Sequence, residues 1–297
     1  MHKFLRSIGF SEYNRTGQIQ DLVRHTIMNA EKREYATAPD KEDVVLVQFS
    51  KDFSENTGIA VCGEFDAKDN FIYYYSYPYL RGTQVSSMEE ITIERHAATE
   101  SYAGVCDDIK VGVTLIFYLN NMIPYLKIKN AGKLPMQGTS LILSALAVQA
   151  SVMMPISKSE RQKRRSHQTM VNRNQLIEAA RKGDEDAIES LTLEDMDTYS
   201  NISKKIQKED IFSLVDTYFM PYGVECDQYS ILGEILECRK TENELTHEKL
   251  WMMRVECNEL QFDVCMNEMD LFGEPAVGRR LKAIIWLQGI VNYPEMN

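Results

Sequence analysis

Two different hydrophobic periods divide the N-terminal half of the chain. Between residues 17 and 30, apolar residues recur at helical spacing, which predicts an amphipathic helix. From residue 44 onward, the apolar residues form short runs bounded by turn residues, which is typical of β-strands. Asn120 and Asn121 favour a hairpin turn, and Pro124 then indicates an edge position. The predicted strands cover residues 44–49, 58–65, 71–79, 91–96 and 111–119.

An uncharged stretch at residues 134–157 admits two interpretations. Its length and the basic residues that follow it are features of a membrane span. Thr139, Ser144 and Gln149 interrupt the apolar residues, however, and such polar groups are costly at bilayer depth. A buried strand or a core helix is therefore favoured, without membrane contact.

A helical segment is predicted to follow this stretch. Asn174 and Asp184 are suitable N-caps for the first two helices, and Gly183 is a suitable stop between them. Residues 192–195 have the spacing of a capping box ahead of a third helix. The predicted helical runs cover residues 175–182, 184–191, 196–206 and 211–219.

The strand pattern returns near the C-terminus, at residues 229–239, 250–257, 260–266 and 280–291. A two-residue turn at Asn258 and Glu259 would place Arg254 opposite Asp263 in a hairpin, so that charge faces charge. Short strands of this kind, with a turn at 270–273, predict a small barrel resembling the oligonucleotide- and oligosaccharide-binding (OB) fold.

Together these elements predict an α+β fold with a β-rich N-terminal domain, a helical connector and a small OB-like C-terminal β-barrel. The predicted boundaries are 1–156 for the mixed domain with mainly antiparallel sheet, 157–220 for the connector, and 221–297 for the barrel.

Charge is distributed unevenly over these segments. The chain has a formal net charge of −11, which disfavours a whole-surface grip on nucleic acid. Residues 157–182 carry eight basic and two acidic residues, whereas residues 183–297 carry 10 basic and 24 acidic ones. The basic patch consists of Lys158, Arg161, Lys163, Arg164 and Arg165. It could contact nucleic acid or an anionic surface, or pair with the acidic C-terminal part.

No apolar run of signal-peptide length follows the basic residues at the N-terminus, so a cytoplasmic location is expected. The six cysteines lack a C-x-x-C pair and are expected to be reduced and mostly buried. A zinc site is disfavoured because no tight knuckle brings two ligands together. No metal and no cofactor are therefore predicted. The soft ligands nearest to one another in the sequence are Cys226, Cys238, His247, Cys257 and Cys265.

Two further patterns have a structural interpretation beside a functional one. Residues 273–278 have the glycine spacing of a phosphate-binding loop, but the expected Lys and Ser or Thr do not follow, so a turn is predicted. Tyr73, Tyr75, Tyr77 and Tyr79 would share one strand face. They form either a stacking platform for a ligand or, as we favour, an aromatic ladder under the N-terminal helix.

Both ends of the chain resemble an uncharacterised bacterial family, a domain of unknown function. The stretches that carry the resemblance are 2–10, 273–280 and 286–289, and the similarity extends over the full chain. The resemblance implies no activity, cofactor or catalytic residue.

Three hypotheses about function remain open. The first is a cytosolic, non-enzymatic binding or adaptor protein whose barrel binds a protein partner or a second copy through Arg254, Arg279, Arg280 and Trp286, although Trp286 could belong to the core. The second is an enzyme acting on a phosphorylated or sugar ligand in a cleft lined by Tyr75, Arg81 and His96. No catalytic motif supports it. The third is a nucleic-acid-binding protein that uses the basic patch and the barrel.

Overall fold

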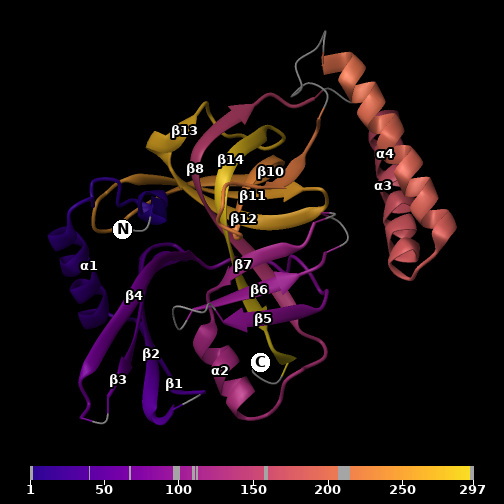
Figure 1. The fold of residues 1–297 in the computed structure, drawn as a ribbon. Helices are drawn as coiled ribbons and strands as arrows, with labels where there is room; N and C mark the ends of the chain where they lie inside the picture. Colours follow the sequence, from indigo (N-terminus) through magenta and orange to yellow (C-terminus); the bar gives the residue numbers. More distant parts are fainter. Residues whose placement is uncertain are drawn as a thin grey trace.

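The computed structural model describes residues 3–39, 41–66, 68–95, 101–108, 111, 113–156, 160–206 and 215–294. Strands outnumber helices among the described residues, and the sheets make up most of the regular structure. The fold is therefore a β-rich α+β fold, as the hydrophobic pattern predicts (Figure 1).

The first sheet is antiparallel and four-stranded, in the order β1-β2-β3-β4. Its strands are β1 (Lys32–Ala38), β2 (Lys41–Ser54), β3 (Thr57–Phe65) and β4 (Phe71–Leu80). Helix α1 (Thr16–Met28) packs against β2 and β3. It is amphipathic, and Leu22 on its apolar side is buried. The predicted N-terminal helix is therefore confirmed.

The second sheet has ten strands in the described ranges and curls back on itself. Five of them, in the ring order β8-β12-β11-β10-β14, form a closed barrel because β14 also pairs with β8. The sheet continues from β14 to β7, β6 and β5. The strands are β5 (Ile91–Arg95), β6 (Tyr102–Cys106), β7 (Leu115–Leu119), β8 (Ser140–Met153), β9 (Tyr218–Pro221), β10 (Gln228–Glu242), β11 (Lys249–Cys257), β12 (Leu260–Asn267), β13 (Leu271–Phe272) and β14 (Arg280–Asn292).

Strand β8 lies in the uncharged stretch and adopts the buried-strand alternative. It pairs antiparallel with β14 over most of its length and parallel with β12. The barrel therefore takes one strand from outside residues 221–297, and the second sheet crosses the predicted boundary at residue 156. Of the helices in the described ranges, none combines the length and the apolar character needed to cross a membrane.

The β11–β12 hairpin confirms the register predicted from the sequence. Arg254 pairs with Asp263 and Val255 with Phe262. Asn258 and Glu259 both have positive φ, at 51° and 65°, as a tight hairpin turn requires.

The helical connector is a hairpin of α3 (Glu160–Arg181) and α4 (Glu185–Ile206), which stands to one side of the sheets in Figure 1. Gly183 (φ 88°) ends the first helix, and Asp184 Oδ1 accepts a hydrogen bond from Ala187 N at 3.1 Å, so the predicted stop and cap are confirmed. The predicted starts at Asn174 and 192–195 are wrong because both helices run through these positions. Thr192 Oγ1 instead donates to Ile188 O within α4.

Three further sequence predictions differ from the structure. Asn120 and Asn121 lead from β7 into α2 (Met122–Asn130) rather than into a hairpin. Pro124 lies in the first turn of α2, where a missing N–H costs nothing because the first turn has no intrahelical acceptors. Of the predicted helix at 211–219, residues 211–214 lie outside the described residues, and its last two residues begin β9.

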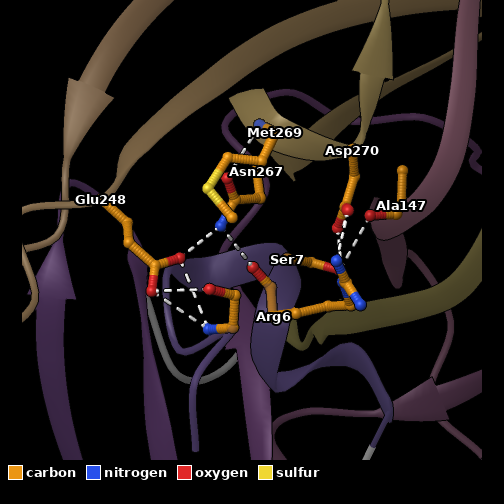
Figure 2. Close-up of polar contacts among 8 residues, drawn as sticks. Arg6, Ser7, Ala147, Glu248, Asn267, Met269 and Asp270 are labelled. Carbon is orange, nitrogen blue, oxygen red and sulfur yellow. Dashed lines mark hydrogen bonds and ion pairs between the residues drawn. The ribbon is translucent and has the colours of Figure 1, made fainter.

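The N-terminal segment η1 (Lys3–Ile8) is a 3-10 helix that packs against β8 and β12 of the barrel. Phe4 and Ile8 are buried, and the Phe4 ring stacks on Trp286 with centroids 5.7 Å apart. Figure 2 shows the polar contacts of this segment: Arg6 pairs with Asp270, and Ser7 Oγ donates to Ala147 O at 2.8 Å.

Asn267 also holds this segment, as Figure 2 shows. Asn267 Nδ2 donates both to Arg6 O and to Glu248, while Asn267 Oδ1 accepts from Met269 N. One amide therefore joins η1 to the end of β12 and to the loop before β11.

Candidate functional site

A polar cleft lies between the first sheet and the end of β14, with a volume of about 240 Å³. We call it the inter-sheet cleft. Strands β1, β2 and β4 supply one wall, and the start of α2 and the end of β14 supply the other. Its lining residues are Lys32, Glu34, Gln48, Ser50, Tyr79, Arg81, Asn120, Asn121, Pro124, Ile290, Val291, Asn292 and Tyr293.

A buried hydrogen-bond network joins the two sheets beside the cleft. Gln288 on β14 is fully buried, and its amide bridges two backbone groups of β4. Its Nε2 donates to Pro78 O at 2.8 Å, and its Oε1 accepts from Leu80 N at 2.9 Å. Ser144 Oγ and Asn120 Nδ2 both donate to Leu80 O. The end of β4 is thus fixed against β8, β14 and the start of α2.

Part of the first-sheet wall consists of neutral polar groups that are held by hydrogen bonds. Gln48 Nε2 donates to Asn120 O at 3.4 Å and lies 3.5 Å from Ser50 Oγ. Tyr77 Oη also donates to Asn120 O. Gln48 and Ser50 are two residues apart on β2, so their side chains point to the same side of the sheet, which faces α2 and β14.

The charged groups at the cleft are paired. Arg81 binds Asp52 and donates through Nη1 to Tyr79 Oη at 3.1 Å, while Lys32 Nζ lies 3.0 Å from Glu34 Oε1. Burial, and then the Asp52 carboxylate, raise the pKa of Tyr79, which therefore remains a neutral phenol that donates to Asp52. The site presents dipoles and balanced charges rather than a free cation.

Two oxygens at the cleft wall have no hydrogen-bond partner within the described part of the chain: Asn120 Oδ1 and Tyr293 Oη. Both side chains are buried and both line the cleft. Leaving a buried polar oxygen without a hydrogen bond costs free energy. Each of these two oxygens therefore marks a place where a hydrogen-bond donor of a ligand could bind.

Of the three residues that the sequence predicts to line a cleft, Arg81 lines the inter-sheet cleft. Tyr75 lies deeper between the sheets, where its Oη approaches Met122 Sδ at 3.9 Å. Burial raises the pKa of Tyr75 well above its ordinary value, so it is a neutral packing residue. His96 lies outside the described residues.

The tyrosine ladder is covered differently from the prediction. Tyr77 packs against Tyr118 of β7, with ring centroids 4.6 Å apart, and against Trp286 of β14. The second sheet, rather than the N-terminal helix, therefore covers this face. A register shift between Cys62 and Gly63 on β3 interrupts the alternation of β4, and Tyr73 is exposed.

The four residues predicted on the barrel do not form one binding face. Trp286 is buried, and its Nε1 donates to Asp227 Oδ2 at 2.7 Å. Arg254 pairs with Glu237 and Asp263 on the barrel wall. Arg279 donates to Glu274 O in its own loop at 2.6 Å. Trp286 and Arg280 are therefore inaccessible to a partner because both are buried.

Arg280 has a structural role that the sequence did not indicate. Its Nε donates to Met154 O at 3.1 Å and its Nη1 donates to Val215 O at 2.8 Å. Met154 precedes the helical hairpin and Val215 follows it, so this one guanidinium joins the chain before the hairpin to the chain after it, at the start of β14.

The remaining predicted sites are placed as follows. The loop at 273–278 is a turn followed by a strand, and Gly273 and Gly278 both have positive φ. Among the described residues no group of three or more His, Cys, Asp and Glu side chains is placed to hold a metal ion. Lys158 lies outside the described residues. Arg161, Lys163, Arg164 and Arg165 lie in α3, with side chains outside the described part.

Nearly the whole chain matches one family profile. The profile that matches is described as "Domain of unknown function, E. rectale Gene description (DUF3881)", and it covers residues 5–289. The chain belongs to this family. Searches of curated proteins and of solved structures each return no match.

The family description names no activity, so the chemistry of the cleft rests on this chain alone. Sequence reasoning missed Gln48, Ser50 and Asn120 because they lie on three separate elements and form no linear motif. Gln288, whose hydrogen bonds lie beside the cleft, falls within the 286–289 stretch that carries the family resemblance, but its burial is seen only in the structure.

Proposed function

We propose that this protein is a binding protein for a small, neutral, polyhydroxylated ligand of about the size of one sugar ring, held in the inter-sheet cleft. The observation that carries the proposal is the lining itself: amides, hydroxyls and tyrosines surround a volume of about 240 Å³, and the charges beside them are paired. Pockets for drug-sized ligands begin at roughly 300 Å³, so a smaller ligand fits better.

The paired charges favour a neutral ligand over a phosphorylated one. Asp52 neutralises Arg81 and Glu34 neutralises Lys32, so a phosphate entering the cleft would have to displace a carboxylate. Hydroxyl groups can both donate and accept, which suits a wall of Gln, Ser and Asn side chains. Tyr79 and Tyr293 add aromatic surface for the apolar face of a ring.

The barrel supports an OB-like assignment, which we propose in a rearranged form. Strands β10, β11 and β12 are consecutive and antiparallel, and a single parallel pair, β12 with β8, completes the ring with β14. This is the ring of the five-stranded OB barrel if β8 stands in the place of its last strand. Because Arg254 on β11 is paired with two carboxylates, this wall offers little attraction for nucleic acid.

The experiment is a ligand-observed NMR and calorimetric titration of the whole protein with neutral monosaccharides and polyols, and with their phosphate esters. We expect at least one neutral sugar to bind. Ser50→Ala should weaken that binding about fivefold to tenfold because it removes one hydrogen-bonding group from the wall.

Ser76→Ala is the matched control because Ser76 lies on β4 outside the cleft lining, with its hydroxyl 3.1 Å from Tyr73 Oη. It should leave the affinity unchanged. Absence of any neutral ligand, or equal losses in both variants, would overturn the proposal. Tighter binding of the phosphate esters, or conversion of the sugar during incubation, would support the enzyme hypothesis instead.

A further inference from the structure

The end of β14 closes one side of the inter-sheet cleft and is held there by side-chain hydrogen bonds. Asn121, between β7 and α2, pairs with the backbone of Val291: its Nδ2 donates to Val291 O at 2.8 Å, and its Oδ1 accepts from Val291 N at 3.1 Å. On the other side, Asn292 Nδ2 donates to Ser140 Oγ at 3.2 Å. The backbone that leads to Tyr293 is therefore fixed where this tyrosine lines the cleft.

Asn120 supplies the cleft with an acceptor whose orientation is fixed. Its Nδ2 donates to Leu80 O and to Gln288 Oε1, both at 3.2 Å. Turning the amide over would set its oxygen against these two acceptors, so Oδ1 is the atom that faces away from them. Asn120 is only 8% exposed, and its Oδ1 has no hydrogen-bond partner among the described residues. A group that meets this oxygen therefore has to donate a hydrogen bond.

Tyr293 adds a hydroxyl that can donate as well as accept. It is 4% exposed, and its Oη likewise has no hydrogen-bond partner in the described part of the chain. Burial, and then the neighbouring Tyr125, raise the pKa of this phenol, so it stays protonated at neutral pH. Two hydrogen bonds hold the Asn120 amide, whereas none within the described ranges holds the Tyr293 hydroxyl. The Tyr293 ring is therefore the part of this wall that can tilt to meet a ligand.

A hydroxyl group is the ligand group that matches both oxygens. It donates through its hydrogen to Asn120 Oδ1, and its oxygen can accept from the Tyr293 hydroxyl. A carbonyl, an ether or a phosphate oxygen only accepts, so it would face Asn120 Oδ1 without a hydrogen bond. An ammonium group would bring a charge into a cleft where the carboxylate of Glu34 already pairs with Lys32.

We propose that Asn120 and Tyr293 determine the specificity of the inter-sheet cleft: Asn120 Oδ1 accepts a hydrogen bond from a ligand hydroxyl, and the Tyr293 hydroxyl donates to a ligand hydroxyl oxygen. The inference rests on the proposed function, because it names the ligand groups that the same cleft recognises. The cleft then selects sugars and polyols with a free hydroxyl at this place over analogues in which that hydroxyl is removed or methylated. A site built to pair with a hydroxyl rejects such an analogue because its own polar groups are left unpaired.

The unpaired hydroxyl of Tyr293 separates a binding role from a structural one. A buried hydroxyl that supports the fold has partners, as Tyr229 does: its Oη accepts from Ile116 N at 2.8 Å and donates to Ile116 O at 3.1 Å. The Tyr293 hydroxyl has no such partner among the residues described, so removing it costs the folded state no hydrogen bond seen there. Tyr293→Phe should therefore leave the urea midpoint of unfolding unchanged or raise it, and its effect should appear in binding.

The test is a calorimetric titration of the full chain and of its Tyr293→Phe variant with D-glucose, D-galactose, D-mannose and myo-inositol, and with the monodeoxy and mono-O-methyl analogues of those that bind. We expect one hydroxyl of the bound compound to be essential, so that its deoxy analogue binds the unsubstituted protein at least about tenfold more weakly. Tyr293→Phe should weaken binding of the parent compound about tenfold. It should leave the affinity for that deoxy analogue unchanged, because the interaction is already absent there.

Tyr229→Phe is the matched control, because Tyr229 lies outside the cleft lining. It should keep the affinity while the urea midpoint falls, since its two hydrogen bonds are lost. A sugar whose binding is weakened by Ser50→Ala but not by Tyr293→Phe would overturn this inference and leave the proposed function standing. A fall in the urea midpoint of Tyr293→Phe as large as that of Tyr229→Phe would also overturn it, because the hydroxyl would then support the fold. If none of the neutral compounds binds, the proposed function and this inference fail together.

Discussion

Arg254 on β11 lies directly opposite Asp263 on β12, with Arg254 Nε 3.4 Å from Asp263 Oδ1. The same guanidinium pairs with Glu237 at 2.7 Å and donates to Thr83 Oγ1 at 3.1 Å. Thr83 also donates to Asp263 through its backbone N–H and its hydroxyl. The loop after β4 is thereby attached to the barrel wall.

Arg254→Ala should lower the free energy of unfolding by about 2 kcal/mol, because it removes the cation that pairs with Asp263 and Glu237 from a position where its side chain is only 13% exposed. Urea unfolding would measure the loss. Arg239→Ala is the control: Arg239 on β10 pairs with Glu55 in an exposed position, and its removal should cost about 0.5 kcal/mol. Equal losses in the two variants would contradict the structural role of Arg254.

Gln288→Leu should lower the free energy of unfolding by about 3 kcal/mol, because it leaves Pro78 O and Leu80 N buried without their partner. The measurement is chemical denaturation followed by tryptophan fluorescence, since Trp286 lies on the same strand. Gln261→Leu on β12 should cost less than about 1 kcal/mol, because the Gln261 amide donates to Glu256 in a half-buried position. A smaller loss at position 288 than at 261 would show that this network does not join the sheets.

Arg280→Met should loosen the base of the helical hairpin, because the carbonyls of Met154 and Val215 lose a shared donor. We expect faster thermolysin cleavage between the barrel and the hairpin and a loss of about 2 kcal/mol in unfolding free energy. Arg279→Met is the adjacent control, since Arg279 donates only to Glu274 O within its own turn among the contacts described here. Unchanged cleavage in the first variant would exclude the clamp.

Cys62 should make the fold less stable at alkaline pH. Burial raises the pKa of its thiol from 9.0 to about 12, so the folded state keeps a proton that the unfolded state releases. This contribution is fully present below pH 9 and is lost as the pH rises from 9 towards 12. At pH 10 the loss from this one thiol is about 1 kcal/mol.

The measurement for Cys62 is urea unfolding at pH 8 and at pH 10. Cys62→Ala should show a fall between the two pH values that is smaller by about 1 kcal/mol than in the unsubstituted protein. Cys226→Ala should reduce the fall by less than Cys62→Ala does, because Cys226 is exposed and burial raises its pKa by less. The same pH dependence in all three proteins would assign the alkaline loss to other groups.

The sequence by itself determined the elements that depend on interactions between residues close together in the chain. The β11–β12 register follows from alternation and a two-residue turn, because a slip of one residue would turn every buried side chain outward. Gly183 and Asp184 marked the hairpin turn because a left-handed residue and a side-chain cap act within a few residues. The weak signals at Asn174 and 192–195 failed because a continuous helix outweighs one possible cap.

Tertiary structure decided what the distant segments do. Strand β8 is uncharged in sequence, and only its pairing with β14 and β12 makes it part of the barrel. Trp and Arg are residue types that are common at interfaces. In this fold, however, Trp286 is buried where it packs on Phe4, and Arg280 is buried where it donates to Met154 O and Val215 O. The inter-sheet cleft joins Ser50, Asn120 and Tyr293, which are far apart along the chain. Side chains on separate elements meet only once the sheets pack, so their sequence spacing carries no information about the site.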